Sequence, residues 1–598
     1  MKQFWGAFLG SMAGLVVATV LFAIITIAGV AAIFADDASS SSAIISVKDR
    51  SVLHLRFSQP VEDRNPENPF ASFSKDDEEG AIDLRTFLEG VRYATTDEKV
   101  KGLFIEVSSV PVGMANFNEI RAALLEFKKS GKFILAYGES MSQSAYRMAL
   151  VADSIFLNPY GDFVWKGLGA EMLFFKGVLD KIGVEPYAVR PSGNKFKSAV
   201  EPFILEKASP ANREQMASML NEIWGDFLLS VSEKTGQPID SLQMFANRLS
   251  IVTAQEAFDH QMVSALAYRD EVVTLLGQKA GWTEEDKEES HLLAFDRYAT
   301  YAALQTKAKS SAKEEIAIVY ASGEIVRGKG DGEQIASDDF CEVLDEVRED
   351  EDVKAVVLRV NSPGGDAMAS ELIWRSIARL KEKKPVVVSM GNLAASGGYY
   401  ISCGANTIFA DAHTLTGSIG VFGLLFNAQR MLNEKLGVTT DTVLTNASAD
   451  FPTGARPMHE REKAALQRNV DKIYTDFTGR VATGRGLDQN LVADSLGEGR
   501  VWTGSQALER GLVDSIGGLE AAIRHAASLA KLESFSIREL PKPQDPFEAF
   551  LKGLNAQVKA AIAAHGLEKV YQTYLTLKHA QQLEGVQMAL PFQYKFIW

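Results

Sequence analysis

"VKGLFIEVSSVPVG" (residues 100–113) and "VKAVVLRVNSPGGD" (residues 353–366) are two versions of one pattern, separated by 253 residues. The same separation aligns "FILAYG" (133–138) with "VVVSMG" (386–391). The chain therefore contains an internal duplication. Each half is expected to have the same order of strands and helices.

The second copy shows the alternation of strands and helices most clearly. "KAVVLRV" (354–360) is a short, valine-rich apolar run, and "KPVVVSM" (384–390) is another. Between them, residues 368–384 carry apolar side chains at helical spacing and a basic last turn. Strands that alternate with helices predict an α/β fold in which crossover helices connect a parallel sheet.

The duplication also divides the chain into domains, and at least two are expected for 598 residues. The N-terminal repeat is predicted at residues 45–270 and the C-terminal repeat at residues 315–544. The charged segment 271–314 between them is predicted to be a helical or loose connector. Residues 545–598 have a helical pattern and are predicted to be a tail that packs on the rest of the protein.

Residues 1–36 are predicted to form a short cytoplasmic tip and a transmembrane anchor. Residues 5–34 contain no charged side chain, whereas a helix needs only about 20 apolar residues to cross a bilayer core. A cleaved signal peptide is the alternative, but its apolar region is typically about 7–15 residues long. Lys2 precedes the segment and Asp36 and Asp37 follow it, so the positive-inside rule predicts that the rest of the chain lies outside.

The bulk composition is that of an ordered globular protein, with 46% hydrophobic and 23% charged residues. The net charge of −15 argues against nucleic acid or another polyphosphate held by general electrostatics. The two cysteines, Cys341 and Cys403, do not form a CxxC pair, so a thiolate zinc site has no support. The sequence leaves open whether they form a disulfide.

Two glycine-rich motifs distinguish the second copy from the first. "NSPGGD" (361–366) follows one predicted strand, and "AASGGYY" (394–400) follows the next. Paired glycines let backbone N–H groups approach a ligand and form an oxyanion hole. Ser396 lies between a predicted strand and the next helix, where its hydroxyl can be exposed beside the N–H of Gly397.

The first copy lacks both motifs. At the 253-residue separation, "PGG" (363–365) corresponds to "VPV" (110–112), and Ser396 corresponds to Gln143. If the glycines and the serine served only the fold, both copies should need them. The comparison favours Ser396 as a nucleophile over a serine in a tight turn.

A serine nucleophile needs a base. Lys197 lies in "NKFKSAVEPF" (194–203) of the first copy, and the corresponding stretch of the second copy has no lysine. The first copy thus has a lysine where the second has none, and the second has a serine where the first has none. One site built from both halves explains this pattern. The alternatives for the base are Lys195 and His413, the nearest histidine downstream of Ser396.

These motifs resemble the signal peptide peptidase A family in its long, two-repeat bacterial form. The resemblance rests on "NSPGGD", "AASGGYY", "TGSIG" (416–420) and "KSAVEPF" (197–203), and it covers nearly the whole chain. It implies tandem ββα-spiral repeats related to the Clp protease and crotonase group, preceded by one transmembrane helix. It also implies a membrane-bound serine protease with a Ser/Lys dyad and no metal or cofactor.

The resemblance further implies site residues and partners. The implied site consists of the nucleophile Ser396, the general base Lys197, the supporting Ser418, and the oxyanion glycines Gly364 or Gly365 with Gly397. The implied partners are hydrophobic signal-peptide remnants as substrate, the lipid bilayer through residues 5–34, and three further copies in a homotetramer. The implied location is the bacterial inner membrane, with the catalytic part on the periplasmic side.

Two other classes of protein share parts of this pattern. Crotonase-like enzymes use a similar oxyanion loop to stabilise thioester enolates, but the acidic chain, its predicted external location and the serine argue against an acyl-carrier substrate. A membrane-anchored scaffold without peptidase activity is the second alternative, because the first copy shows that catalytic motifs can be lost while the fold persists.

Overall fold

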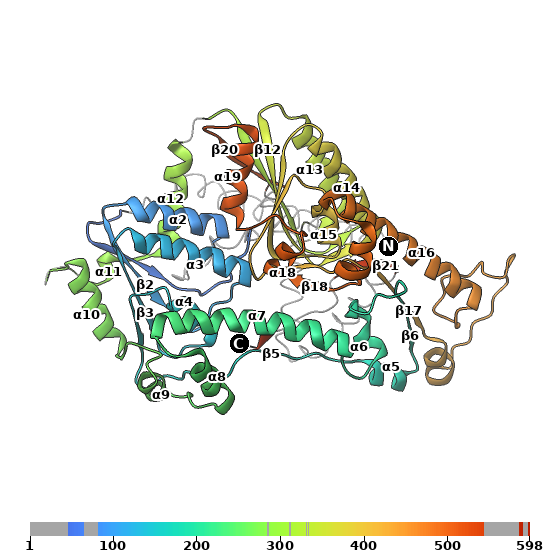
Figure 1. Ribbon diagram of the computed structural model, residues 1–598, viewed down its shortest axis with the longest axis horizontal. Coiled ribbons are helices and arrows are strands. Elements are labelled where there is room, and N and C mark those ends of the chain that lie inside the picture. Colours follow the sequence, from blue (N-terminus) through green and yellow to red (C-terminus); the bar gives the residue numbers. More distant parts are fainter. Residues whose placement is uncertain are drawn as a thin grey trace, which may run out of the picture.

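The computed structural model describes residues 46–64, 82–283, 286, 288–309, 312–330, 332, 334–542, 585–589 and 596–597. The predicted anchor at residues 5–34 and most of the predicted tail lie outside this part of the chain. Among the described residues, no helix is both long enough and apolar enough to cross a membrane. Figure 1 shows the two repeats side by side, with the N-terminal repeat in blue and green and the C-terminal repeat in yellow to red.

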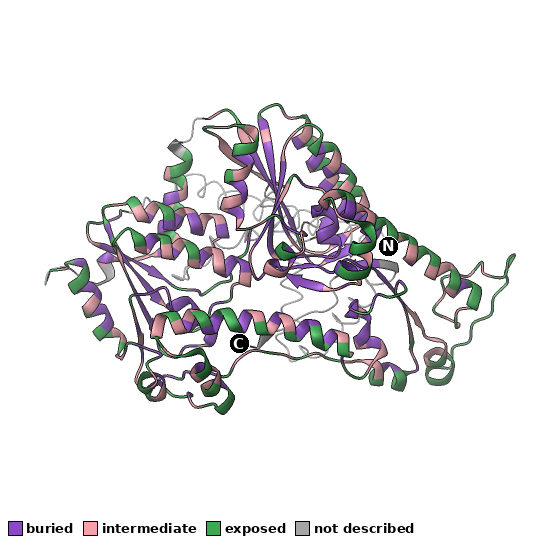
Figure 2. Ribbon diagram, in the orientation of Figure 1, coloured by how far each residue is buried: buried purple, intermediate pink, exposed green. Residues whose placement is uncertain are grey.

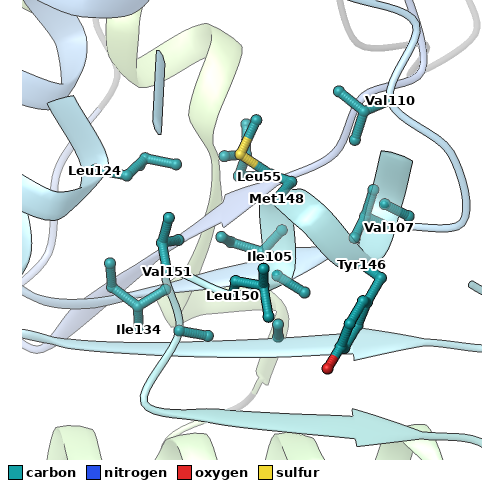
Figure 3. Close-up of a cluster of buried hydrophobic side chains, with 14 of the residues drawn as sticks. Leu55, Ile105, Val107, Val110, Leu124, Ile134, Tyr146, Met148, Leu150 and Val151 are labelled. Carbon is teal, nitrogen blue, oxygen red and sulfur yellow. The ribbon is translucent and has the colours of Figure 1, made fainter. Parts of the chain in front are cut away.

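The N-terminal repeat contains a six-stranded parallel sheet with the strand order β7-β4-β3-β2-β1-β8. Its strands are β1 (Ser51–Leu55), β2 (Val100–Glu106), β3 (Phe133–Gly138), β4 (Ser154–Leu157), β7 (Ala265–Leu266) and β8 (Leu292–Ala294). Helices α2 (Leu84–Thr96) and α3 (Met114–Lys129) cover one face, and α10 (Arg269–Ala280) covers the other. Figure 3 shows part of the apolar interior between the sheet and its helices.

The segment predicted as a connector, residues 271–314, contributes most of its length to this N-terminal unit. Strand β8 pairs with β1, and helix α12 (Phe295–Lys309) packs on α2. The Phe295 ring lies 4.6 Å from the Phe87 ring, centroid to centroid, and Tyr298 is fully buried. These apolar contacts place the segment in the fold, although its sequence is conspicuously charged.

The C-terminal repeat contains a sheet with the order β18-β16-β14-β12-β9-β20, parallel except for the β16–β18 pair. The strands in this order are β9 (Glu315–Ser322), β12 (Val353–Ser362), β14 (Val386–Ala395), β16 (Leu415–Gly417), β18 (Val501–Thr503) and β20 (Ser536–Leu540). Two further strands of the sheet branch from β14: β15 (Thr407–Ala410) pairs with β14, and β19 (Ser515–Ile516) pairs with β15. Helices α13 (Ser337–Glu349) and α14 (Ala367–Lys381) cover one face, and α19 (Leu519–Ala530) covers the other. Figure 2 shows the central strands buried between these layers, which explains their nearly continuous apolar sequence. The predicted tandem α/β repeats are confirmed.

A third sheet joins the two repeats, with the strand order β11-β10-β13-β21-β17-β6. Strand β6 (Glu185–Val189) of the N-terminal repeat pairs antiparallel with β17 (Phe422–Asn427) of the C-terminal repeat. The other members are β10 (Ile325–Val326), β11 (Ile335–Ala336), β13 (Gly364–Asp366) and β21 (Gly585–Ala589). Helix α7 (Pro210–Thr235) also runs along both repeats (Figure 1), and Glu222 on it accepts a hydrogen bond from Thr503 Oγ1 at 2.8 Å.

A buried ion cluster is a further link between the repeats. Arg359, on β12, is fully buried and lies 2.7 Å from the Asp63 carboxylate and 3.0 Å from the Glu119 carboxylate, both in the N-terminal repeat. Burial by itself lowers the pKa of Arg359, but the two carboxylates outweigh burial and raise it. The cation therefore stays charged in the interior and holds two carboxylates of the other repeat.

Replacing this arginine tests the link. Arg359→Met leaves two buried carboxylates without a cation, so the free energy of unfolding should fall by about 3–5 kcal/mol in chemical denaturation. Arg92→Met is the matched control, since Arg92 also pairs across the repeats, with Glu520 at 2.6 Å, but is 58% exposed. The control should change stability by less than about 1 kcal/mol. Equal effects of the two substitutions would contradict the assigned role of Arg359.

Candidate active site

Ser396 lies at the junction of β14 and the short helix α15 (Gly397–Ser402), in the position that the sequence predicted. Its backbone angles, φ 57° and ψ −113°, are unusual for a residue with a side chain and cost about 1–3 kcal/mol. Two hydrogen bonds hold this conformation: the Ser396 N–H donates to Gly417 O, and the Tyr400 N–H donates to Ser396 O, both at 2.8 Å. The turn is thus fixed by its surroundings.

Lys197 meets this serine from the other repeat of the same chain. Its Nζ atom lies 2.8 Å from Ser396 Oγ, 2.9 Å from Ser418 Oγ and 3.0 Å from Ser418 O. All three residues are fully buried. The structure therefore brings together the predicted nucleophile, base and supporting serine, and it does so within one chain.

The lysine lies in surroundings that disfavour its charge. Burial lowers the pKa of Lys197 well below the usual value for lysine. The three atoms that hydrogen-bond to the Lys197 amine are all oxygens of serine residues. Among the residues that the structure describes, Lys197 is not found in an ion pair, in contrast to Lys195. A neutral amine is the favoured form in such a place, because an unpaired ammonium ion loses its hydration without compensation.

Ser418 holds the lysine through its own backbone as well as its hydroxyl. It follows β16 with a positive φ of 49°, and its N–H donates to Arg500 O at 2.7 Å. Both its carbonyl and its hydroxyl oxygen point to the Lys197 amine. The amine is therefore fixed in direction toward Ser396.

The two alternative bases lie elsewhere. Lys195 is 62% exposed and pairs with Glu498 at 3.2 Å. His413 Nε2 lies 2.8 Å from the Asp226 carboxylate, and its Nδ1 lies 2.9 Å from Asn118 Nδ2. The contacts of Lys195 and His413 are with residues of the other repeat, so both side chains help to join the repeats. Lys197 is the basic residue that contacts Ser396.

The glycine motif of β13 lies against the start of α15. A Cβ atom on Gly364 would lie 2.6 Å from Gly397 N, and a Cβ atom on Gly397 would lie 3.1 Å from Gly365 N. Gly364 also has a φ of +96°, which side chains other than that of glycine rarely allow. The predicted oxyanion glycines therefore gather at one point beside Ser396.

Two features of this site were not predicted from the sequence. Ser362 Oγ accepts a hydrogen bond from the Gly364 N–H at 3.1 Å, although Ser362 is part of the quoted "NSPGGD" motif. Strand β21, from the C-terminal end of the chain, pairs directly with β13.

Within the described part of the chain, no group of three or more His, Cys, Asp or Glu residues is arranged to hold a metal ion. Cys341 and Cys403 are both free thiols.

Comparison with known proteins shows the family of this chain. The sequence matches Peptidase family S49 twice, over residues 126–283 and 378–533, one match in each repeat. It is 33% identical to "Serine protease SPPA, chloroplastic" of Arabidopsis thaliana over 488 residues, which are 80% of this chain and 70% of that protein. The chain belongs to Peptidase family S49, in a form with two repeats. It is a serine protease. The two alternatives raised by the sequence, a crotonase-like enzyme and a scaffold without peptidase activity, do not fit this assignment.

Other relatives differ in length and in name. "Protease 4" of Salmonella typhi is 34% identical over 490 residues, covering 80% of this chain and 77% of that protein. "Putative signal peptide peptidase SppA" of Enterococcus faecium is 40% identical over 208 residues, 35% of this chain and 60% of that protein. Among solved structures, a point mutant of ClpP1 from Listeria monocytogenes covers 34% of this chain and 94% of its own, at 16% identity and a TM-score of 0.24. The relation to the Clp and crotonase group stays a prediction.

Proposed function

We propose that the protein is a membrane-anchored endopeptidase that cleaves signal-peptide remnants with a Ser396/Lys197 dyad. The observation that supports this most strongly is the 2.8 Å distance between Lys197 Nζ and Ser396 Oγ in a fully buried site. The name of the Enterococcus faecium relative supports the same substrate class.

Acylation of the enzyme begins with the neutral lysine. Its two N–H groups donate to the oxygens of Ser418, and its lone pair accepts the proton of the Ser396 hydroxyl. Ser396 Oγ attacks the scissile carbonyl carbon as the proton moves to Nζ. The resulting ammonium then gives this proton to the leaving amine, the C–N bond breaks, and an ester to Ser396 remains.

Hydrolysis of the ester reuses the same groups. The neutral lysine accepts a proton from water, the hydroxide attacks the ester carbonyl, and the proton returns to Ser396 Oγ as the acid product leaves. In both steps the oxyanion is placed to accept hydrogen bonds from backbone N–H groups. Gly397 and Gly365 fit this role best, because the Gly364 N–H already donates to Ser362 Oγ.

The proposed cellular setting follows from the sequence. Residues 5–34 would anchor the chain in the bacterial inner membrane, with the N-terminal tip in the cytoplasm and both repeats on the periplasmic side. A homotetramer at the membrane surface would present the sites to hydrophobic peptides left in the bilayer. The substrates would be extended peptides with small and apolar side chains.

Loss of the nucleophile tests the reaction. Ser396→Ala should reduce cleavage of a defined leader peptide by a factor of about 10³ or more, since the dyad acts as a unit. Mass spectrometry of the products, with wild type and variant in parallel, gives the cleavage sites and the rate. Unchanged products from a correctly folded Ser396→Ala chain would contradict the proposal.

The pH dependence tests the lysine. The base is active when neutral, so kcat/KM should rise with pH through the lowered pKa of Lys197 and then level off below the usual lysine value of about 10.4. Steady-state rates with a fluorogenic peptide between pH 5 and 10 measure this limb. Ser418→Ala removes a hydrogen bond to the amine without removing the base. This variant should therefore retain some activity, and the pH at which its kcat/KM rises should be shifted. A wild-type limb at the usual lysine value would refute the assignment of Lys197.

A further inference from the structure

Residues 498–502 of the C-terminal repeat are hydrogen-bonded to the part of the other repeat that carries Lys197. The Phe196 N–H, one residue before the lysine, donates to Glu498 O at 3.1 Å. A Cβ atom on Gly499 would lie 2.5 Å from Lys197 Cβ and 2.8 Å from Lys197 N. Such a close approach requires glycine, and its φ of +80° does so as well. The segment therefore passes directly against the backbone of the catalytic lysine.

The same segment is also hydrogen-bonded to the residue that supports the lysine. The Ser418 N–H donates to Arg500 O at 2.7 Å. Gln215, on α7, is 1% exposed and joins the two sides. Its amide donates to Phe196 O at 3.1 Å and accepts from the Val501 N–H at 3.3 Å. The backbone of this segment thus determines how the base lies relative to its supporting serine.

The Arg500 side chain adds a contact between two aromatic rings. Its guanidinium carbon lies 4.6 Å from the centre of the Phe196 ring and 4.5 Å from the centre of the Trp502 ring. Both rings belong to residues that are 5% exposed, whereas the arginine side chain is 21% exposed and pairs with Glu214 at 3.0 Å. Cation–π contacts strengthen when the cation loses water. The three side chains, named here the arginine stack, join the lysine segment to β18.

We propose that Arg500 is a positioning residue for the catalytic dyad. By stacking on the two rings, it keeps the Lys197 amine in place against Ser396 and closed to water. The proposal rests on the proposed function, because it takes a neutral Lys197 as the base. A looser stack admits water to the amine, and water stabilises the ammonium form. The expected consequence is a higher pKa for Lys197.

The pH dependence of Ser396 reactivity tests the proposal. The probe is a fluorophosphonate: Ser396 Oγ bonds to phosphorus, fluoride leaves, and the hydroxyl proton passes to Lys197. In the wild-type chain, the labelling rate should rise with pH as the lysine becomes neutral. Arg500→Met should move this rise upward by about one pH unit, so that labelling at a pH on the rising limb falls about tenfold. Mass spectrometry of the labelled chain measures the rate.

Three comparisons separate the arginine stack from other effects. Methionine at position 500 fills similar space without a buried donor, whereas Arg500 Nε is buried and has no hydrogen-bond partner in the described part of the chain. Arg510→Met is the matched control, because Arg510 also stacks on Trp502, at 4.0 Å, and should leave the pH dependence unchanged. Phe196→Leu keeps every charge and removes one ring, so it should shift the rise in the same direction as Arg500→Met.

Three results would overturn the inference. The first is a labelling rise at the wild-type pH in both Arg500→Met and Phe196→Leu. The second is an equal shift in Arg510→Met. The third is loss of the cooperative unfolding transition in both Arg500→Met and Phe196→Leu, which would show that the stack holds the fold rather than the dyad. A wild-type labelling rate that does not rise with pH would refute the assignment of Lys197 itself, and the inference with it.

Discussion

The proposed chemistry depends on one contact between the repeats: the amine of Lys197 lies 2.8 Å from the hydroxyl oxygen of Ser396. A lysine can act as a base near neutral pH only if it is kept away from water and from carboxylates. That condition requires the two repeats to close over the amine completely. The shared sheet of β6 and β17 and the buried Arg359 cluster hold the two repeats together.

The N-terminal repeat shows a different residue at the position that corresponds to Ser396. Gln143, which corresponds to Ser396, begins helix α4 (Gln143–Ala149) and is buried. Its side-chain amide donates to Gly167 O and accepts from the Lys166 and Gly167 N–H groups. The position has become structural, and the repeat contributes Lys197 instead. Each half thus keeps the sheet and supplies one part of a single site.

Much of this arrangement could be predicted from the sequence, because it rests on short-range patterns repeated at one separation. The central strands of both repeats, the junction at Ser396 and the pairing of a lysine with a serine from different copies all follow from comparing the two halves. The assignment of Lys197 over Lys195 could not be derived from residues alone, since burial depends on tertiary contacts. In the structure Lys195 points to Glu498 and solvent.

Other features had no local signal. Residues 271–309 are charged overall, but the apolar face of α12 that packs on α2 has too few residues to stand out from that charge. Strand β21 is five residues long and pairs with strands more than 150 residues away, so neither its pattern nor its neighbours in sequence indicate its place. Long-range pairing of this kind is determined by the space that the rest of the fold leaves.

The most direct test of the account is whether two inactive chains can restore each other. Ser396→Ala and Lys197→Ala chains, co-expressed so that they fold and assemble together, each retain one half of the dyad. Because the structure forms the dyad within one chain, the mixture should cleave a leader peptide no faster than either variant alone. Recovery of a substantial fraction of wild-type activity would show that the lysine and the serine come from different chains, and would contradict the account.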